Sequence, residues 1–144
     1  MSSTATLTAP HSSRRGINIS LWIGQVVLAL MLGMAGFLKL TTPLADLAIK
    51  MGWVNAIPEA LVRFIGFSEI LAAIGLILPS MLKIQPRLTV YAALGLAVIM
   101  VLAIPLHISR GEYGGLPINF FILALSVFIA WGRAKLAPIA PKNS

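Results

Sequence analysis

The sequence contains no cysteine, only two histidines, and 4 acidic residues against 11 Lys and Arg. Without cysteine the chain has no disulfide, thiol relay, iron–sulfur cluster or thiolate metal site of its own. A haem held by two histidines is not expected either, because one histidine, His11, precedes the first apolar segment. Nucleophile elbows, glycine-rich phosphate loops and histidine pairs at metal spacing are missing too. We therefore expect no metal, no cofactor held within the chain, and no enzyme activity from the chain alone.

What the sequence does contain is apolar sequence in long runs: 58% of its residues are hydrophobic, 10% are charged, and the mean hydropathy is +0.94. Crossing a bilayer takes about 20 residues of helix. The composition and the spacing of the runs predict an all-α protein, an integral membrane four-helix bundle forming one domain over residues 17–132. Residues 1–16 and 133–144 are predicted to be cytoplasmic tails, the first of them mobile. The four spans are expected at about 17–40, 58–78, 88–107 and 116–132.

The longest connection, between the first and second spans, carries a helical pattern of its own. Thr42 is a candidate cap, Pro43 suits a first helical position, and Leu44, Leu47 and Met51 recur at helical spacing. This pattern predicts a short interfacial helix between spans 1 and 2, lying along the membrane surface or folded over the mouth of the bundle as a lid.

The positive charge of the chain is distributed as membrane topology requires. Basic residues lie before the first span, in the connection between the second and third spans, and after the fourth span. The positive-inside rule therefore places both termini in the cytoplasm. The membrane is expected to be the cell membrane, which is the inner membrane in a bacterium. No basic stripe suited to a phosphate backbone is present, and no nucleic-acid partner is expected. The basic residues concerned are Arg14, Arg15, Lys83, Arg87, Arg133, Lys135 and Lys142.

A single carboxylate, Glu69, interrupts the second span. It lies ten residues after Glu59, or about 15 Å along a helix, which places it near the middle of the membrane. An ionised carboxylate there costs at least about 2.5 kcal/mol, so it must be protonated, paired or in contact with a wet cavity. Small residues one turn away, Gly66, Ala72 and Ala73, indicate that it faces the protein. We expect a functional role for Glu69, with a purely structural role as the alternative.

Two further polar side chains are expected on the same side of the membrane as the start of this span. Lys39 ends the first span and His107 ends the third, so both could reach toward Glu69 from neighbouring helices. The alternatives are that Lys39 extends to the interface with its charge in water, and that His107 is an ordinary interfacial residue.

Supporting polar residues are expected at the same side. Arg63 is four residues from Glu59 and six from Glu69, which favours an ion pair with Glu59 over one with Glu69. Asn119 and Tyr113, near the start of the fourth span, could complete a polar funnel.

Three segments resemble the DoxX-like family of small membrane proteins. The resemblance covers roughly residues 20 to 132 and implies a four-helix membrane bundle with Lys39, Glu69 and His107 at the family's recurring polar positions. Members are associated with a thiosulfate:quinone oxidoreductase, with oxidative-stress complexes and, among distant relatives, with assembly, so the resemblance leaves the activity open. The segments are Gly36-Phe37-Leu38-Lys39-Leu40, Arg63-Phe64-Ile65-Gly66-Phe67-Ser68-Glu69-Ile70 with Leu71-Ala72-Ala73, and His107-Ile108-Ser109-Arg110-Gly111-Glu112.

Three functions stay open at this point. The leading hypothesis is a membrane protein that binds a small apolar ligand, a quinone or a lipid, in an outer-facing pocket around Glu69. The second is an assembly, chaperone or interaction subunit whose polar cluster holds the bundle together while its helices dock a membrane-protein partner or a second copy of the chain. The third is a subunit of a quinone-linked redox complex, which would need an electron donor from another chain because no residue type here carries electrons.

Overall fold

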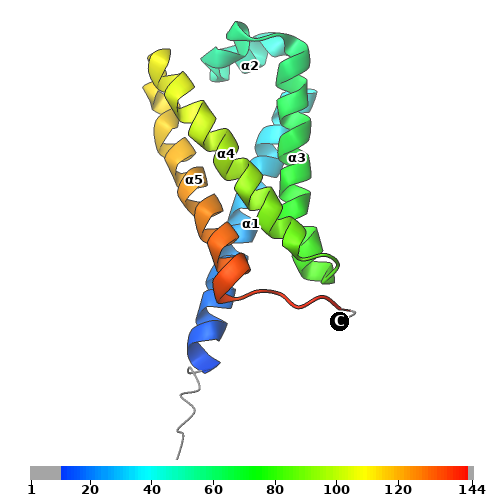
Figure 1. Cartoon of the computed structure of the whole chain (residues 1–144). Helices are drawn as coiled ribbons and strands as arrows, with labels where there is room; N and C mark the ends of the chain where they lie inside the picture. Colours follow the sequence, from blue (N-terminus) through cyan, green and yellow to red (C-terminus); the bar gives the residue numbers. More distant parts are fainter. Residues whose placement is uncertain (1–10, 143–144) are drawn as a thin grey trace, which may run out of the picture.

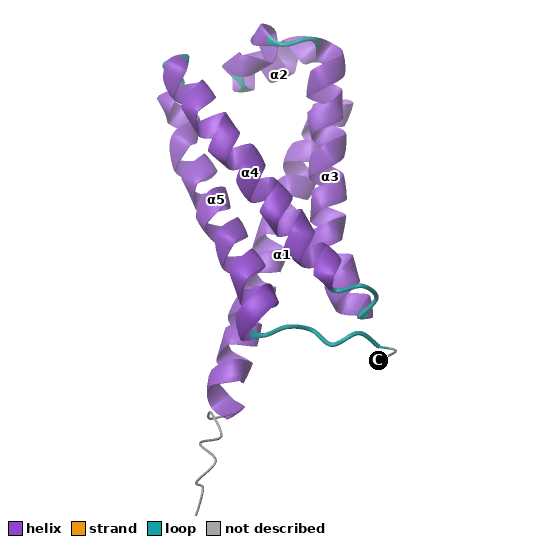
Figure 2. Cartoon of the chain, in the orientation of Figure 1, coloured by secondary structure: helices purple, strands orange, loops and turns teal. Residues whose placement is uncertain are grey.

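The computed structural model describes residues 11–142, which are helical with short connections and contain no strand (Figure 2). Four long helices carry the fold, and the chain between the first two of them forms a short helix and a 3-10 turn. The long helices are α1 (His11–Thr41), α3 (Glu59–Leu82), α4 (Arg87–Ser109) and α5 (Leu116–Trp131). The short elements are α2 (Leu44–Lys50), the 3-10 turns Gly52–Ala56 and Tyr113–Gly115, and a π-helical turn, Gly132–Leu136.

The surface of the bundle is that of a membrane protein. Four helical segments, Ser13–Thr41, Glu59–Leu82, Arg87–Ser109 and Tyr113–Leu136, are long and apolar enough to cross a bilayer. Large apolar side chains point outward along all four, and Leu30 and Leu102 are each 69% exposed. A surface this apolar is unfavourable in water and suits lipid. The predicted fold class, an all-α bundle of four spans, is confirmed.

The helices pack in two pairs. The most extensive contacts join α1 to α3 and α4 to α5, and α3 also packs on α4. The core between them is formed by residues from all four helices, including Leu28, Leu76, Leu96 and Ile129. Figure 1 shows that α2 lies at one end of the bundle, while the start of α1 and the C-terminal segment lie at the other. We call these the α2 end and the terminal end.

Two glycines allow α1 and α3 to cross closely. A Cβ atom added to Gly36 would lie 2.5 Å from the carbonyl oxygen of Gly66, and one added to Gly66 would lie 2.7 Å from the Cβ of Lys39. Neither position can hold a side chain without moving the backbone of its neighbour. Small residues at a helix crossing are the usual means of close packing in lipid, where no hydrophobic drive brings helices together.

The predicted interfacial helix is present as α2, followed directly by the 3-10 turn. Leu47, Val54 and Val62 form a second buried cluster, which holds this segment against the first turn of α3. The predicted cap was wrong: Pro43 occupies the N-cap position and no side chain caps the helix. Proline fixes the backbone angle there without a capping bond.

The helices extend beyond the predicted spans at several ends. α1 begins at His11, so residues 11–16 are helical and not a mobile tail, and α3 continues through Pro79 to Leu82. Residues 133–142 contact the bundle: Arg133 is buried, and the backbone N–H of Lys142 donates to the carbonyl of Lys83 at 2.9 Å. The remainder of the predicted tails, residues 1–10 and 143–144, lies outside the described residues.

The glycine crossing generates a stability prediction. Gly36→Ala should lower the stability of the detergent-solubilised protein by about 1–3 kcal/mol, because the added methyl overpacks the α1–α3 contact. Gly33→Ala is the matched control, since nothing lies within 4 Å of a Cβ added to Gly33. Thermal unfolding should show a lower midpoint for Gly36→Ala and no loss for Gly33→Ala. Equal midpoints for the two variants would show that the close crossing does not limit stability.

Candidate functional site

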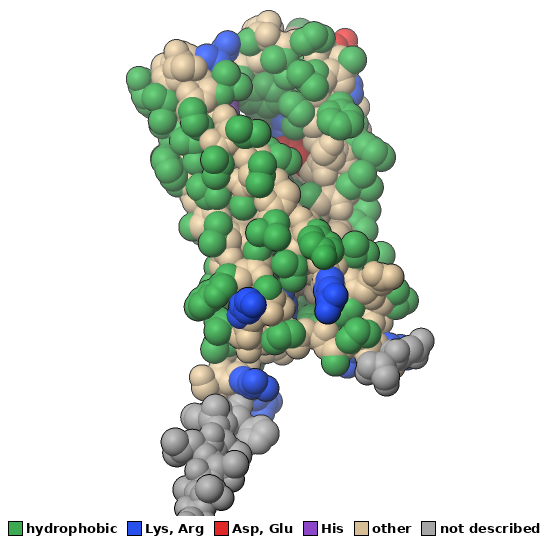
Figure 3. Space-filling view, in the orientation of Figure 1, with side chains coloured by type: hydrophobic (Ala, Val, Ile, Leu, Met, Phe, Trp, Pro, Cys, Tyr) green, Lys and Arg blue, Asp and Glu red, His purple; other side chains and the backbone are tan. Residues whose placement is uncertain are grey.

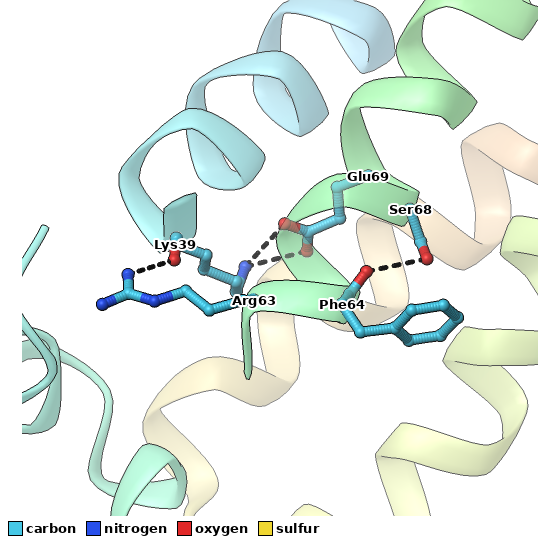
Figure 4. A network of polar contacts seen from close by, with 5 residues as sticks. All are labelled: Lys39, Arg63, Phe64, Ser68 and Glu69. Carbon is cyan, nitrogen blue, oxygen red and sulfur yellow. Dashed lines mark hydrogen bonds and ion pairs between the residues drawn. The ribbon is translucent and has the colours of Figure 1, made fainter. Parts of the chain in front are cut away.

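The central feature of the α2 end is an ion pair between α1 and α3. The ammonium of Lys39 lies 2.8 Å from both carboxylate oxygens of Glu69. Figure 4 shows the two side chains pointing toward one another from the last turn of α1 and from the middle of α3. Each charge therefore has its counterion inside the apolar part of the bundle, where an unpaired charge would be most costly.

Arg63, which precedes Glu69 on α3, contacts the end of α1 that carries Lys39. One guanidinium nitrogen donates to the carbonyls of Lys39 at 2.6 Å and Thr42 at 2.8 Å, while another donates to Glu59 at 2.8 Å. The last carbonyls of a helix lack intrahelical donors and carry the negative end of its dipole. A cation is favourable there, so Arg63 fixes the end of α1 at which Lys39 lies. Its ion pair is with Glu59 and not with Glu69, as the spacing favoured.

The two members of the ion pair differ in exposure. The Lys39 side chain is 6% exposed and that of Glu69 is 21% exposed. The Lys39 ammonium also lies 5.9 Å from the centre of the Trp53 ring, within reach of a cation–π contact from the segment that follows α2. Figure 3 shows that the molecule is hollowed below α2, and that basic and acidic atoms lie in the hollow among apolar side chains. The segment after α2 thus covers the ion pair on one side, while Glu69 stays partly exposed.

His107, the third predicted site residue, makes a different contact. Its Nδ1 donates to Glu112 at 2.9 Å, across the turn in which Gly111 adopts a φ of +69°. Arg110 donates to the other oxygen of Glu112 at 3.0 Å. The positive φ of Gly111 reverses the chain at the end of α4 and brings residues five apart face to face. The expectation that His107 reaches Glu69 does not match these contacts, because the turn supplies the imidazole with a nearer carboxylate.

The two residues expected in a polar funnel behave differently from each other. Tyr113 is 63% exposed in the 3-10 turn before α5. Asn119, in the first turns of α5, has a buried amide nitrogen without a hydrogen-bond partner among the described residues. A buried donor without a partner is uncommon in a folded protein and calls for an acceptor. Asn119 is therefore an unpaired buried donor on α5, which packs chiefly on α4, and Tyr113 lies on the surface.

A second set of buried polar side chains lies toward the terminal end. From the sequence, the charged residues there were expected only to set the membrane topology. Gln25 is fully buried in α1, donates to the carbonyl of Leu76 and accepts a hydrogen bond from Arg133 at 2.6 Å. Ser80 and Thr89 share a buried hydrogen bond of 2.8 Å between α3 and α4. The signal was available for Gln25, since it interrupts an apolar run as Glu69 does. Arg133 gave no such signal, because a basic residue after a span is usual.

No group of three His, Asp or Glu side chains among the described residues comes close enough to hold a metal ion. The candidate site at the α2 end contains a paired ammonium and carboxylate. Lys39 and Glu69 can exchange or share a proton with a bound group, and Asn119 can donate a hydrogen bond. Binding and proton transfer are the reactions this arrangement can support.

The turn at Glu112 generates a prediction for pH dependence. The hydrogen bond from His107, together with Arg110, holds the pKa of the Glu112 carboxyl below its ordinary value. A lowered pKa in the folded state means that the stabilisation is present above the unfolded value, about 4.3, and is lost as pH falls through the lower folded value. The stability difference between the unmodified protein and Glu112→Gln should be present at about pH 5 and shrink as the pH falls below about 4. Thermal unfolding across this range measures it, and a difference that widens on acidification would contradict the assignment.

Comparison with known proteins places the chain in a family. A family model, described as the DoxX-like family, matches residues 23–129, a range that contains Lys39, Arg63, Glu69, His107 and Asn119. Neither the curated proteins nor the solved structures gave a match. The match spans most of the chain and all four membrane-spanning helices. The protein therefore belongs to the DoxX-like family.

Proposed function

We propose that this DoxX-like membrane protein binds a small, mostly apolar ligand, a quinone or a lipid, in the hollow below α2 at the outer face of the membrane. Glu69 accepts a hydrogen bond or a proton from the ligand, and Lys39 holds the carboxylate and balances its charge. The observation that carries the proposal is the pairing of Lys39 with Glu69 at 2.8 Å in the interior of the bundle, with Glu69 left partly exposed.

The exposed part of Glu69 is the first argument. A carboxylate in the middle of a membrane-spanning helix cannot face acyl chains without a large penalty. We infer that the 21% of its side chain that is exposed faces the hollow and not the acyl chains. Apolar side chains around acidic and basic atoms are visible in that hollow (Figure 3), and a mainly apolar pocket with a few polar groups is the usual form of a small-molecule site.

Free donors are the second argument. The Lys39 ammonium has three N–H donors, and Glu69 takes two of them. The buried amide nitrogen of Asn119 takes no partner among the described residues. A ligand with carbonyl oxygens, such as a quinone or an ester, would satisfy donors of this kind while its apolar body contacts the surrounding side chains.

Native mass spectrometry of the protein in mild detergent, with identification of co-purified small molecules, tests the proposal. The unmodified protein should retain a defined small molecule. The amount retained by Glu69→Gln should be at least tenfold lower, because the neutral amide no longer balances the charge of Lys39 or accepts a proton. Asp46→Asn is the matched control: it removes a carboxylate that is exposed on α2, and retention should be unchanged. Thermal unfolding establishes that each variant is folded.

Other outcomes would overturn the proposal. Equal retention in a folded Glu69→Gln variant would remove Glu69 from the binding site. A protein that carries another polypeptide, regardless of Glu69, and no small molecule would favour the assembly function. Reduced yield of that complex in Glu69→Gln would favour it further.

A further inference from the structure

A second pocket lies at the terminal end, far along the bundle from α2. It forms where the C-terminal segment runs back from the end of α5 across the start of α4 (Figure 1), and it has a volume of about 810 Å³. Arg87 and Tyr91 of α4 line one side, Arg133 lines another, and residues 138–141 close it. The hydrogen bond between Lys142 and Lys83 holds the segment in place. The walls thus contain two guanidinium groups and a tyrosine.

Arg133 is a buried cation that forms no ion pair within residues 11–142. Only 4% of the residue is exposed. Its Nε and Nη1 donate at 2.6 Å to Gln25 and Asn18, both neutral, and its guanidinium stacks 5.3 Å from the ring centre of Trp22. Its Nη2 is buried with no hydrogen-bond partner in residues 11–142. Because burying an unneutralised charge is costly, an anion in the adjacent pocket would be held strongly.

No acidic side chain competes for that role. The 4 acidic residues of the sequence are Asp46, Glu59, Glu69 and Glu112, and they lie at the α2 end or, in the case of Glu69, along the middle of α3. Figure 3 shows basic side chains and no acidic ones on the lower part of the visible face. The pocket is therefore in a region of positive potential, and its occupant should be negatively charged.

An apolar groove continues from this pocket between α3 and α4. It has a volume of about 510 Å³ and is lined by Leu71, Leu78 and Leu88 among others, and Tyr91 lines both spaces. The lining of α3 runs from Leu71 to Leu82, roughly 16 Å along the helix axis. Small residues lie where α3 and α4 approach each other along the groove: a Cβ added to Gly75 would lie 3.1 Å from that of Ala92. A groove of this length and polarity suits an acyl chain.

We propose that the terminal end binds an anionic phospholipid, with its phosphate at Arg133 and Arg87 and one acyl chain along the groove between α3 and α4. Tyr91 lines both spaces, so the basic pocket at the helix ends adjoins the apolar groove along the helices. A phospholipid has the same order of parts, a charged phosphate followed by apolar acyl chains. This site is separate from the hollow below α2 and does not depend on a ligand there. The bound lipid would join the C-terminal segment to the bundle and neutralise Arg133.

Native mass spectrometry of the whole chain, delipidated and then titrated with phosphatidylglycerol or phosphatidylcholine, tests the site. Phosphatidylglycerol should bind at a first, saturable site more tightly than phosphatidylcholine. Arg87→Gln should weaken that site about fivefold, and Arg133→Gln should weaken it more. Arg87 is the primary variant because its side chain is exposed, whereas Arg133 also holds Gln25 and Asn18. Arg15→Gln is the matched control, since it removes an exposed arginine from the same end but outside the pocket, and should leave binding unchanged.

Three results would overturn the proposal. Equal binding of the two lipids would remove the role of charge. Equal weakening by Arg87→Gln and Arg15→Gln would show a diffuse attraction and no site. Glycerol 3-phosphate, which has the phosphate without acyl chains, should not compete at lipid concentrations; full competition would identify the occupant as a soluble anion.

Discussion

The contact on which the rest of the α2 end depends is the ion pair between Lys39 and Glu69. An unpaired charge on either helix would be strongly destabilising inside the membrane. The attraction between the two charges offsets the cost of burying them only when they are close together. That distance requires α1 and α3 to cross closely, which Gly36 and Gly66 permit, since a side chain at either position would meet the backbone or the Lys39 stem. Arg63 then fixes the end of α1 through the Lys39 carbonyl. The small residues and the charged residues therefore depend on one another in the packing of α1 against α3.

The two ends of the bundle handle buried polarity in opposite ways. At the α2 end the cation and the anion come from the chain itself, and the pair is covered by a segment anchored through Leu47 and Val54. At the terminal end the chain supplies the cation, Arg133, and surrounds it with neutral partners. In the function we propose, the first arrangement would respond to a ligand by moving a proton or a hydrogen bond. The second has no anion within residues 11–142, and in the further proposal a lipid supplies it.

The sequence predicted the fold class well because span length and apolar composition are local properties. It also predicted that Lys39 could reach Glu69, which the ion pair confirms, since polar residues inside apolar runs stand out. It misplaced the contact of His107, because the turn created by the positive φ of Gly111 pairs it with Glu112, and a glycine in a connection does not specify which side chains the turn brings together. It missed Arg133, whose burial depends on how the chain packs after α5. The second span was predicted to end at about residue 78, but Pro79 is tolerated inside α3.

The central claim is that Lys39 and Glu69 are an interdependent charged pair, and a double-mutant cycle in detergent tests it most directly. Lys39→Met and Glu69→Gln alone should each destabilise the protein by about 3–5 kcal/mol, because each leaves a buried charge without its partner. The double variant should recover most of that loss, since both charges are then gone. Free energies of unfolding that simply add in the double variant would contradict the claim and separate the two residues.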